Sequence, residues 1–413
     1  MVPSGWKAIT LGDLVTSSAF GPRFSSDLYS ENGAIGTIRT TDLCDEGTIN
    51  YNTIPYADLD IDEFKSHILD SGDLLITRSG TCGIPCIFEK QDKPIIAGAF
   101  LIRFKLKSDV DASYLQNLLK YDVTQHHISK MASGGVQKNL TGTSLKKLKL
   151  EVPELKEQRR ISKILSTWDK AISTTERLID NSKQQKKALM QQLLTGKKRL
   201  PDDSGKPFGR EWEEVLVGNV AELTAGGTPS TKKSEYWGGD IPWMNSGEIN
   251  LKQVFSVEGR ITELGLQNSS TKQIPKNSVL IALAGQGKTR GTVAINRIEL
   301  CTNQSIAAIM PNRTQLYPEF LYFNLDNRYQ ELRSMSTGDG GRGGLNLSIL
   351  RAIRLQLPSI SEQKKIASVL TKADKEIEVL QQQLSDLKQE KKALMQQLLT
   401  GKRRVIVDEK EVA

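Results

Sequence analysis

The residues best suited to chemistry in this chain lie in polar, glycine-rich loops. Arginine and lysine can bond guanine edges, asparagine and glutamine can bond adenine edges, and lysines and glycine amides can reach phosphates. Such loops recur at corresponding places in two halves of the chain, which favours nucleic-acid recognition over ordinary surface polarity. The candidate DNA-binding residues are Arg23, Arg39, Arg78, Thr81, Gln137, Lys138, Asn139, Thr228, Ser230, Lys232, Lys233, Asn245, Gln286, Lys288, Arg290, Arg342 and Asn346.

One loop also approximates the phosphate-binding loop of nucleotide-hydrolysing enzymes. Residues 282–289 read ALAGQGKT, with alanine in place of the first glycine. The corresponding loop of the first half has no Gly-Lys-Thr, and the RGTVAINRIEL that follows is typical of a turn and a strand rather than a helix. A P-loop ATPase or phosphotransferase that uses Ala282–Thr289 is nevertheless the main alternative in another functional class.

Other catalytic and metal-binding arrangements have weak support. Cys82 and Cys86 have no second cysteine pair and no neighbouring histidine, so we interpret them as small buried thiols. The chain has 3 histidines, no G-x-S-x-G motif and no G-x-G-x-x-G that opens a βαβ unit. We therefore expect no catalytic residue, metal site or cofactor in this chain.

Two long helices are predicted to position the loops. The string KKALMQQLLTGK occurs at 186–197 and again at 391–402. Around each copy, apolar residues recur in alternating steps of four and three, and each pattern begins after a proline and ends at a glycine. The predicted helix–helix seam consists of Ile161, Leu165, Trp168, Ile172, Ile179, Leu189, Leu193, Ile366, Leu370, Ile377, Leu380, Leu384, Leu387, Leu394 and Leu398. The matched patterns favour pairing within one chain, and pairing between chains is the alternative.

The segments before the two helices are diverged copies of one α+β unit. GAIGTIRTTDL from Gly33 aligns with GDIPWMNSGEI from Gly239, and PIIAGAFLIRFKL and LCTNQSIAAIM are both predicted as strand sequence. The copies differ most in their loops, as expected for related recognition modules of different specificity or for drifted structural duplicates. The predicted organisation is a domain at 1–153, a helix at 154–200, a domain at 201–358, a helix at 359–404 and a tail at 405–413.

Composition narrows the class of protein. The 413 residues are 38% hydrophobic and 25% charged, as in ordinary globular proteins, and the four cysteines suit a reducing cytosol. No apolar run predicts a membrane span or a signal peptide, so we expect a cytoplasmic location. The net charge of +8 concentrates in 154–200, with 12 basic and 5 acidic residues, and in 359–404, with 10 and 6. This distribution fits a polyanionic partner, and solvated helix faces would show it as well.

The order of these segments resembles the DNA-specificity subunit of type I restriction–modification enzymes. The resemblance rests on PELKEQRRISKILSTWDKAI and PSISEQKKIASVLTKADKEI, and on GGTPST…EYWGGDIPWMNSGEI between them. It implies two α+β target-recognition domains, each of which reads one half of a bipartite double-stranded DNA target. The two helices would form an antiparallel coiled coil that sets the distance between the half-sites. The first half departs from the family pattern at Gly21-Pro22-Arg23.

The same resemblance implies partners. Two methyltransferase subunits would carry S-adenosylmethionine and methylate adenine at N6, and two restriction subunits would use ATP and magnesium to translocate and cleave DNA. The chain itself would be non-catalytic and hold none of these cofactors. A specificity subunit of a methylation-only system is the narrower alternative, and a structural coiled-coil protein is the alternative outside DNA recognition.

Overall fold

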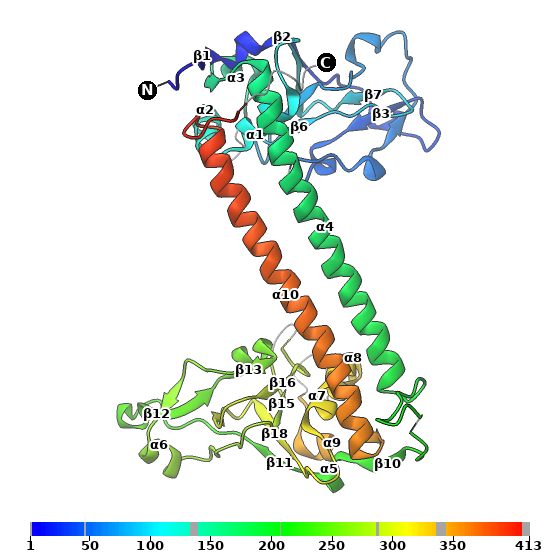
Figure 1. Cartoon of the computed structure of the whole chain (residues 1–413), viewed down its shortest axis with the longest axis vertical. Helices are drawn as coiled ribbons and strands as arrows, with labels where there is room; N and C mark the ends of the chain where they lie inside the picture. The colour runs from blue at the N-terminus through cyan, green and yellow to red at the C-terminus, as the bar shows by residue number, and fades with distance from the viewer. Residues whose placement is uncertain are drawn as a thin grey trace. The chain divides into compact units, whose positions relative to one another are not determined.

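The computed structural model describes residues 2–44, 47–132, 139–206, 208–285, 289–335 and 344–406. The chain divides into two compact units (Figure 1), one formed by Met1–Glu176 with Gln383–Ala413 and the other by Arg177–Gln382. Helix α4 (Leu155–Leu193) begins in the first unit and ends in the second, and α10 (Ile360–Leu398) does the reverse. We call the globular part of the first unit domain 1 and that of the second domain 2. The predicted α+β class is confirmed.

Domain 1 combines short sheets with helices. One sheet has the antiparallel order β2-β8-β5-β6, a second has the order β4-β3-β7 with β3 and β7 parallel, and β1 pairs with β9. The apolar face of α1 buries Tyr114, Leu115, Leu118 and Leu119 in the main core. The elements are β1 Lys7–Thr10, β2 Val15–Phe20, β3 Ile35–Ile38, β4 Tyr56–Ala57, β5 Leu74–Thr77, β6 Pro85–Ile87, β7 Ile95–Ala97, β8 Leu101–Leu106, α1 Ala112–Lys120, α2 Asp122–Met131, α3 Gly142–Lys146 and β9 Lys149–Val152.

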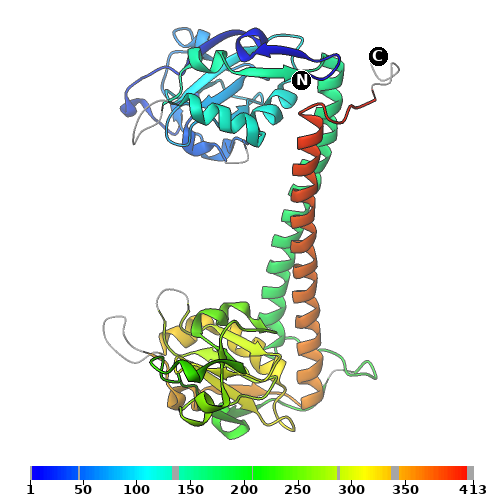
Figure 2. The same cartoon turned by 90° about the vertical axis from the view of Figure 1, so that its left-hand side faces the viewer.

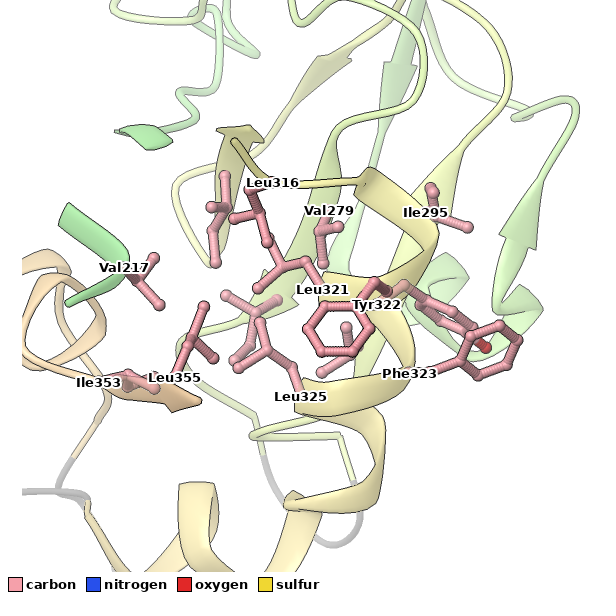
Figure 3. Close-up of a cluster of buried hydrophobic side chains, with 14 of the residues drawn as sticks. Val217, Val279, Ile295, Leu316, Leu321, Tyr322, Phe323, Leu325, Ile353 and Leu355 are labelled. Atoms are coloured by element: carbon pink, nitrogen blue, oxygen red, sulfur yellow. The ribbon is translucent and has the colours of Figure 1, made fainter. Parts of the chain in front are cut away.

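Domain 2 repeats this plan with the sheets β11-β18-β15-β16-β13, β14-β12-β17 and β10-β19. Figure 3 shows part of its core, in which Leu321 and Leu325 of α7 lie among residues of the sheets, including Val279 and Leu355. The elements are β10 Glu213–Leu216, α5 Val217–Val220, β11 Ala221–Ala225, β12 Trp237–Met244, β13 Gln253–Val254, β14 Arg260–Ile261, α6 Glu263–Gln267, β15 Val279–Ala282, β16 Val293–Asn296, β17 Cys301–Thr302, β18 Ile306–Pro311, α7 Pro318–Asn327, α8 Tyr329–Ser334, α9 Leu347–Arg351 and β19 Arg354–Leu357.

The two segments predicted as strand sequence each form two strands rather than one. β7 pairs with β3, whereas β8 pairs with β2 and β5 in another sheet. In domain 2, β17 pairs with β12, and β18 pairs with β11 and β15. The chain crosses between sheets at residues 98–100 and 303–305, which form corresponding turns. These turns lie beside the polar loops that follow β2 and β11.

Helices α4 and α10 lie side by side and run in opposite directions (Figure 2). In the first unit, Lys391 Nζ of α10 donates to Asp169 Oδ1 of α4 at 2.5 Å, and Lys388 donates to Glu176 at 2.7 Å. In the second unit, Lys186 of α4 pairs with Asp374 of α10. The same lysine–aspartate pair thus occurs once in each unit with the helices exchanged. Pairing of the helices within one chain is confirmed.

The ends of the predicted seam belong to the domain cores. Ile161, Leu165 and Leu398 are buried in the core of domain 1, and Leu193, Ile366 and Leu370 in that of domain 2. Ile179 is also buried. The other seam residues are partly buried, namely Trp168, Ile172, Leu189, Ile377, Leu380, Leu384, Leu387 and Leu394. Burial of each leucine or isoleucine contributes about 1.5–3 kcal/mol, so each helix end is fixed to its domain.

The Glu-Gln pair that recurs at the start of each long helix has a structural role. Glu157 accepts two hydrogen bonds of 2.7 Å from Arg404, and Glu362 accepts bonds of 2.5 and 2.7 Å from Arg199. Each arginine lies three residues after a glycine, Gly196 or Gly401, that follows the C-terminal end of the other long helix. Within each unit, the beginning of one long helix therefore holds the chain that leaves the end of the other.

Candidate nucleic-acid interface

Arg39 and Asn245 occupy corresponding positions at the ends of β3 and β12. Each backbone N–H donates to an acidic residue three positions on, Arg39 to Asp42 at 2.8 Å and Asn245 to Glu248 at 3.0 Å. The same carboxylates hold the two side chains. Arg39 donates from Nε at 3.0 Å and from Nη2 at 2.9 Å, and Asn245 Nδ2 donates at 2.8 Å. A shared frame thus presents an arginine in domain 1 and an asparagine in domain 2, each held in one orientation.

The Arg39–Asp42 pair is asymmetric in exposure. The Asp42 side chain is 1% exposed and that of Arg39 is 46% exposed, so the anion lies in the protein and the cation faces outward. The hydrogen bond to Asp42 raises the pKa of Arg39. Nη2 also donates to the Thr53 carbonyl at 2.9 Å. Within the described part of the chain, Nη1 has no hydrogen-bond partner and is available to a ligand.

The loops after β2 and β11 reach these positions because glycine permits close backbone approach. A Cβ atom on Gly21 would lie 2.1 Å from the Ala97 oxygen, and one on Gly226 would lie 2.2 Å from the Thr302 oxygen. The following residues include Arg23 in domain 1 and Thr228 in domain 2, which are both exposed. Thr228 Oγ1 donates to Gln304 Oε1 at 2.5 Å. Arg23 and Arg39 line one pocket of about 720 Å³.

A second group of predicted residues meets at the end of β5. Arg78 lies over the Phe20 ring with its guanidinium carbon 4.3 Å from the centroid, a favourable cation–π contact. Asn139 forms a β-bridge with Ser79, and the Leu140 N–H donates to the Arg78 carbonyl at 2.9 Å. The exposed Thr81 accepts through its carbonyl from Thr77 Oγ1 at 2.6 Å. Arg78 and Asn139, far apart in sequence, are therefore neighbours.

The remaining described candidates lie in domain 2, and several have structural contacts. The Ser230 carbonyl accepts from Trp237 Nε1 at 3.2 Å, and Lys232 is exposed. Lys233 Nζ donates to Tyr236 Oη at 2.9 Å, and this bond raises the pKa of Lys233. Asn346 Oδ1 accepts from the Ile349 N–H at 2.9 Å and so caps α9.

Arg290 is half-buried. The predicted residues Gln137, Lys138, Gln286, Lys288 and Arg342 lie outside the described residues. The hydrogen bonds and ring contacts above fix where the described candidates lie in the fold. That these residues bind DNA stays a prediction.

The structure does not support the phosphate-loop alternative. A P-loop leads into a helix whose N-terminal amides face the phosphates. Here the described residues that follow it form a turn and then strand β16, which pairs with β15. Described parts of the chain contain no group of three or more His, Cys, Asp or Glu side chains that could hold a metal ion.

The thiols are only partly as predicted. Cys86 is buried, and burial raises its pKa to about 12. The interpretation of Cys82 as a buried thiol was wrong. It is half-buried because it lies in the turn after β5, where Sγ is 3.1 Å from the Arg78 carbonyl. Separately, no helix in the described ranges is long and apolar enough to cross a membrane.

Sequence reasoning missed several residues around these loops, including Tyr29, Thr37, Phe100 and Gln304. Phe100 is 57% exposed and Tyr29 is 39% exposed, which is more than is usual for aromatic side chains. The register of β3 with β7 and of β12 with β17 places Thr37 and Trp243 at corresponding positions. The aligned strings GAIGTIRTTDL and GDIPWMNSGEI already contained this difference between threonine and tryptophan.

Two domains with a common frame and different polar loops, joined by paired helices, define a two-part recognition protein. The model of the "Type I restriction modification DNA specificity domain" matches residues 3–182 and 209–389, and the chain belongs to this family. The chain is thus a DNA-specificity subunit of the type I restriction–modification class, as the resemblance predicted.

Individual relatives and a solved structure agree with this assignment. The putative type I restriction enzyme MjaX specificity subunit of Methanocaldococcus jannaschii is 24% identical, across 98% of this chain and 95% of that protein. The MjaIX specificity subunit of the same organism is 34% identical over 43% of this chain and 40% of its own length. The crystal structure of a type I S subunit from M. genitalium has the same fold, with a TM-score of 0.61 and 16% identity, across 97% of this chain and 99% of that one.

Proposed function

We propose that each domain reads one half of a bipartite double-stranded DNA target. The observation that supports this assignment of one half-site to each domain is that Arg39 and Asn245 occupy corresponding positions in the two domains. The same backbone frame and a corresponding carboxylate, Asp42 or Glu248, hold both side chains. Arg39 keeps Nη1 for the acceptors of guanine, whereas Asn245, whose Oδ1 also accepts from the Gly247 N–H at 2.8 Å, keeps a second Nδ2 hydrogen and a second Oδ1 lone pair for adenine. A duplicated scaffold with different chemistry at one held position is what two modules of different base preference require.

The antiparallel helices fix the number of base pairs between the half-sites. Both α4 and α10 pass from one unit into the other, and their ends are buried in the domain cores. Once one domain is bound, a stiff connection makes binding of the other domain to its half-site intramolecular. The effective concentration of that second domain at its half-site is high only where the spacing fits. Spacing thereby becomes part of the specificity.

The partners follow from the duplication. Each unit carries the same helix anchor, Glu157 with Arg404 in one and Glu362 with Arg199 in the other. A chain built from two such similar units offers two equivalent surfaces, and these suit two copies of one partner. We infer that two methyltransferase subunits carry S-adenosylmethionine and methylate adenine N6, and that two restriction subunits use ATP and magnesium to cleave DNA. The chain is a non-catalytic cytoplasmic subunit of this complex.

The test is a map of N6-methyladenine in the DNA of cells that express a cognate type I methyltransferase with or without this chain. We expect a two-part motif with a fixed gap that is methylated only when the chain is present. Methylation of a single uninterrupted motif, or the same methylation without the chain, would contradict the proposed function. Arg39→Ala should alter one half of the motif and Asn245→Ala the other half.

A further inference from the structure

The pocket at Arg23 and Arg39 is open in domain 1 because a small side chain lies where domain 2 has a large one. In domain 2, the Trp243 indole N–H donates to the Gly227 carbonyl at 3.0 Å, and its ring meets Trp237 edge-on at 5.0 Å. Trp243 thus bridges the strand end and the loop after β11. Domain 1 has Thr37 at the corresponding place, and the pocket of about 720 Å³ lies between the strand end and the loop after β2.

The lining of this pocket combines aromatic rings, cations and one unsatisfied hydroxyl. Tyr29 and Phe100 line it and are well exposed. Phe24 meets Tyr29 edge-on at 5.4 Å. Thr37 is 2% exposed, and its Oγ1 is buried without a hydrogen-bond partner among the described residues. A buried polar group left unmet costs about 1–3 kcal/mol, which a polar ligand atom would recover.

The concave shape limits what such a pocket can bind. The edges of stacked bases lie at the floor of a groove, so side chains that protrude are needed to reach them. A pocket instead receives a group that protrudes from the DNA. Aromatic walls suit the flat face of a base better than a phosphate, and the exposed Arg23 beside them suits a flanking phosphate.

We propose that this pocket binds one nucleobase of the domain 1 half-site after the base has turned out of the duplex. The base stacks on Phe100 or Tyr29, and the Thr37 hydroxyl bonds its edge. Domain 2 reads its half-site without such a step, because Trp243 occupies the corresponding place. The inference rests on the proposed function, since it assumes that domain 1 contacts DNA.

The test uses the full chain in complex with its methyltransferase subunits and duplexes that contain the mapped motif. Each base of the domain 1 half-site is kept while its complement is replaced, one position at a time, to create a mismatch. A base that must leave the stack does so more easily when it is unpaired, so binding tightens at that position. We expect a gain of about tenfold at one position. The methylated adenine will show a gain of its own from the methyltransferase.

Variants of the pocket distinguish the gain in affinity at the pocket position from the gain at the methylated adenine. Phe100→Ala and Thr37→Trp should weaken binding of the matched site by about tenfold and abolish the gain at the pocket position, while the gain at the methylated adenine persists. Phe100 is exposed, so its truncation leaves the core intact. Thr37→Val keeps the volume and should lose severalfold in affinity. The control is Phe255→Ala, which removes an aromatic ring that is 68% exposed in domain 2 and should change nothing at this half-site.

Two results would overturn the proposal in distinguishable ways. If no mismatch gain in the half-site depends on Phe100 and Thr37 while the wild-type complex still methylates its two-part motif, the pocket does not bind a base. If the wild-type complex shows no specific binding to any two-part motif, the proposed function fails and the pocket assignment fails with it.

Discussion

Replacement of Gln363 by leucine should destabilise the second unit by removing one buried amide. Gln363 is 0% exposed, and its Oε1 accepts from the Tyr317 N–H at 2.8 Å. Its Nε2 donates to the Gln315 carbonyl at 2.8 Å and to the Pro358 carbonyl at 2.9 Å. Gln158 makes matching bonds in the first unit, to the Asp111 N–H at 2.9 Å and the Pro153 carbonyl at 2.9 Å. The amide therefore ties the start of each long helix to its domain.

The magnitude follows from these bonds. Each typical hydrogen bond contributes a net of about 1 kcal/mol, and a buried N–H or carbonyl without a partner costs about 1–3 kcal/mol. Leucine recovers part of this loss through burial of its apolar side chain. The expected net loss in the free energy of unfolding is about 2–4 kcal/mol. For a unit of this size, the melting temperature of that unit should fall by roughly 4–16 °C.

The assay is differential scanning calorimetry of the full chain, with hydrogen exchange followed by mass spectrometry to locate the change. Gln363→Leu should speed exchange in α7 and the start of α10, and Gln158→Leu should do so in α1 and the start of α4. The control is Gln381→Leu at an exposed position of α10, which should stay within about 0.5 kcal/mol. A loss for Gln363→Leu as small as that of the control would refute this account of the helix anchor.

Further predictions concern spacing, close approach and thiol chemistry. Insertion of seven residues after both Glu176 and Gln382 lengthens each helix by roughly 10 Å, so methylation mapping should show a gap longer by about three base pairs; an unchanged gap would contradict the spacer role. Gly226→Ala should weaken recognition of the domain 2 half-site at least about tenfold, because its Cβ would lie 2.2 Å from the Thr302 oxygen, whereas Gly209→Ala enters open space and should match wild type in the same binding assay. At pH 8, iodoacetamide should modify the exposed Cys44 and spare Cys86, whose raised pKa of about 12 keeps the thiol protonated; equal labelling in the native chain would show the burial to be wrong.

Local periodicity explains what the sequence predicted well. The heptad spacing of residues such as Leu165 and Leu370 fixes a helix and its apolar face without knowledge of the rest of the fold. The duplicated Glu-Gln motif predicted duplicated structure, although its hydrogen bonds to Arg199, Arg404 and the domain backbones could not be foreseen. The correspondence of β3 with β12 could also be predicted, because GAIGTIRTTDL and GDIPWMNSGEI align without a gap.

Features that depend on long-range packing escaped prediction. The pocket of domain 1 exists because Thr37 stands where domain 2 has the large side chain of Trp243. The sequence around a small residue does not show whether its neighbours leave a pocket beside it. The crossing between sheets at residues 98–100 depends on strand partners that are distant in sequence. Asn346 was predicted to bind DNA from its residue type and its place in a recurring polar loop, and that stays a prediction. The sequence did not show that its Oδ1 also caps α9. Residue type identified polar loops, whereas geometry showed which of their atoms are already used.

The central claim, that each domain reads one half-site, is tested most directly by a chain with two copies of domain 1. Residues 201–358 would be replaced by residues 1–153, with both long helices retained, and N6-methyladenine would be mapped in cells that carry the methyltransferase. Because α4 and α10 run antiparallel, we predict an inverted repeat in which the domain 1 half-site stands on both sides of the gap. A soluble, active chimera that still methylates the original second half-site would contradict the claim.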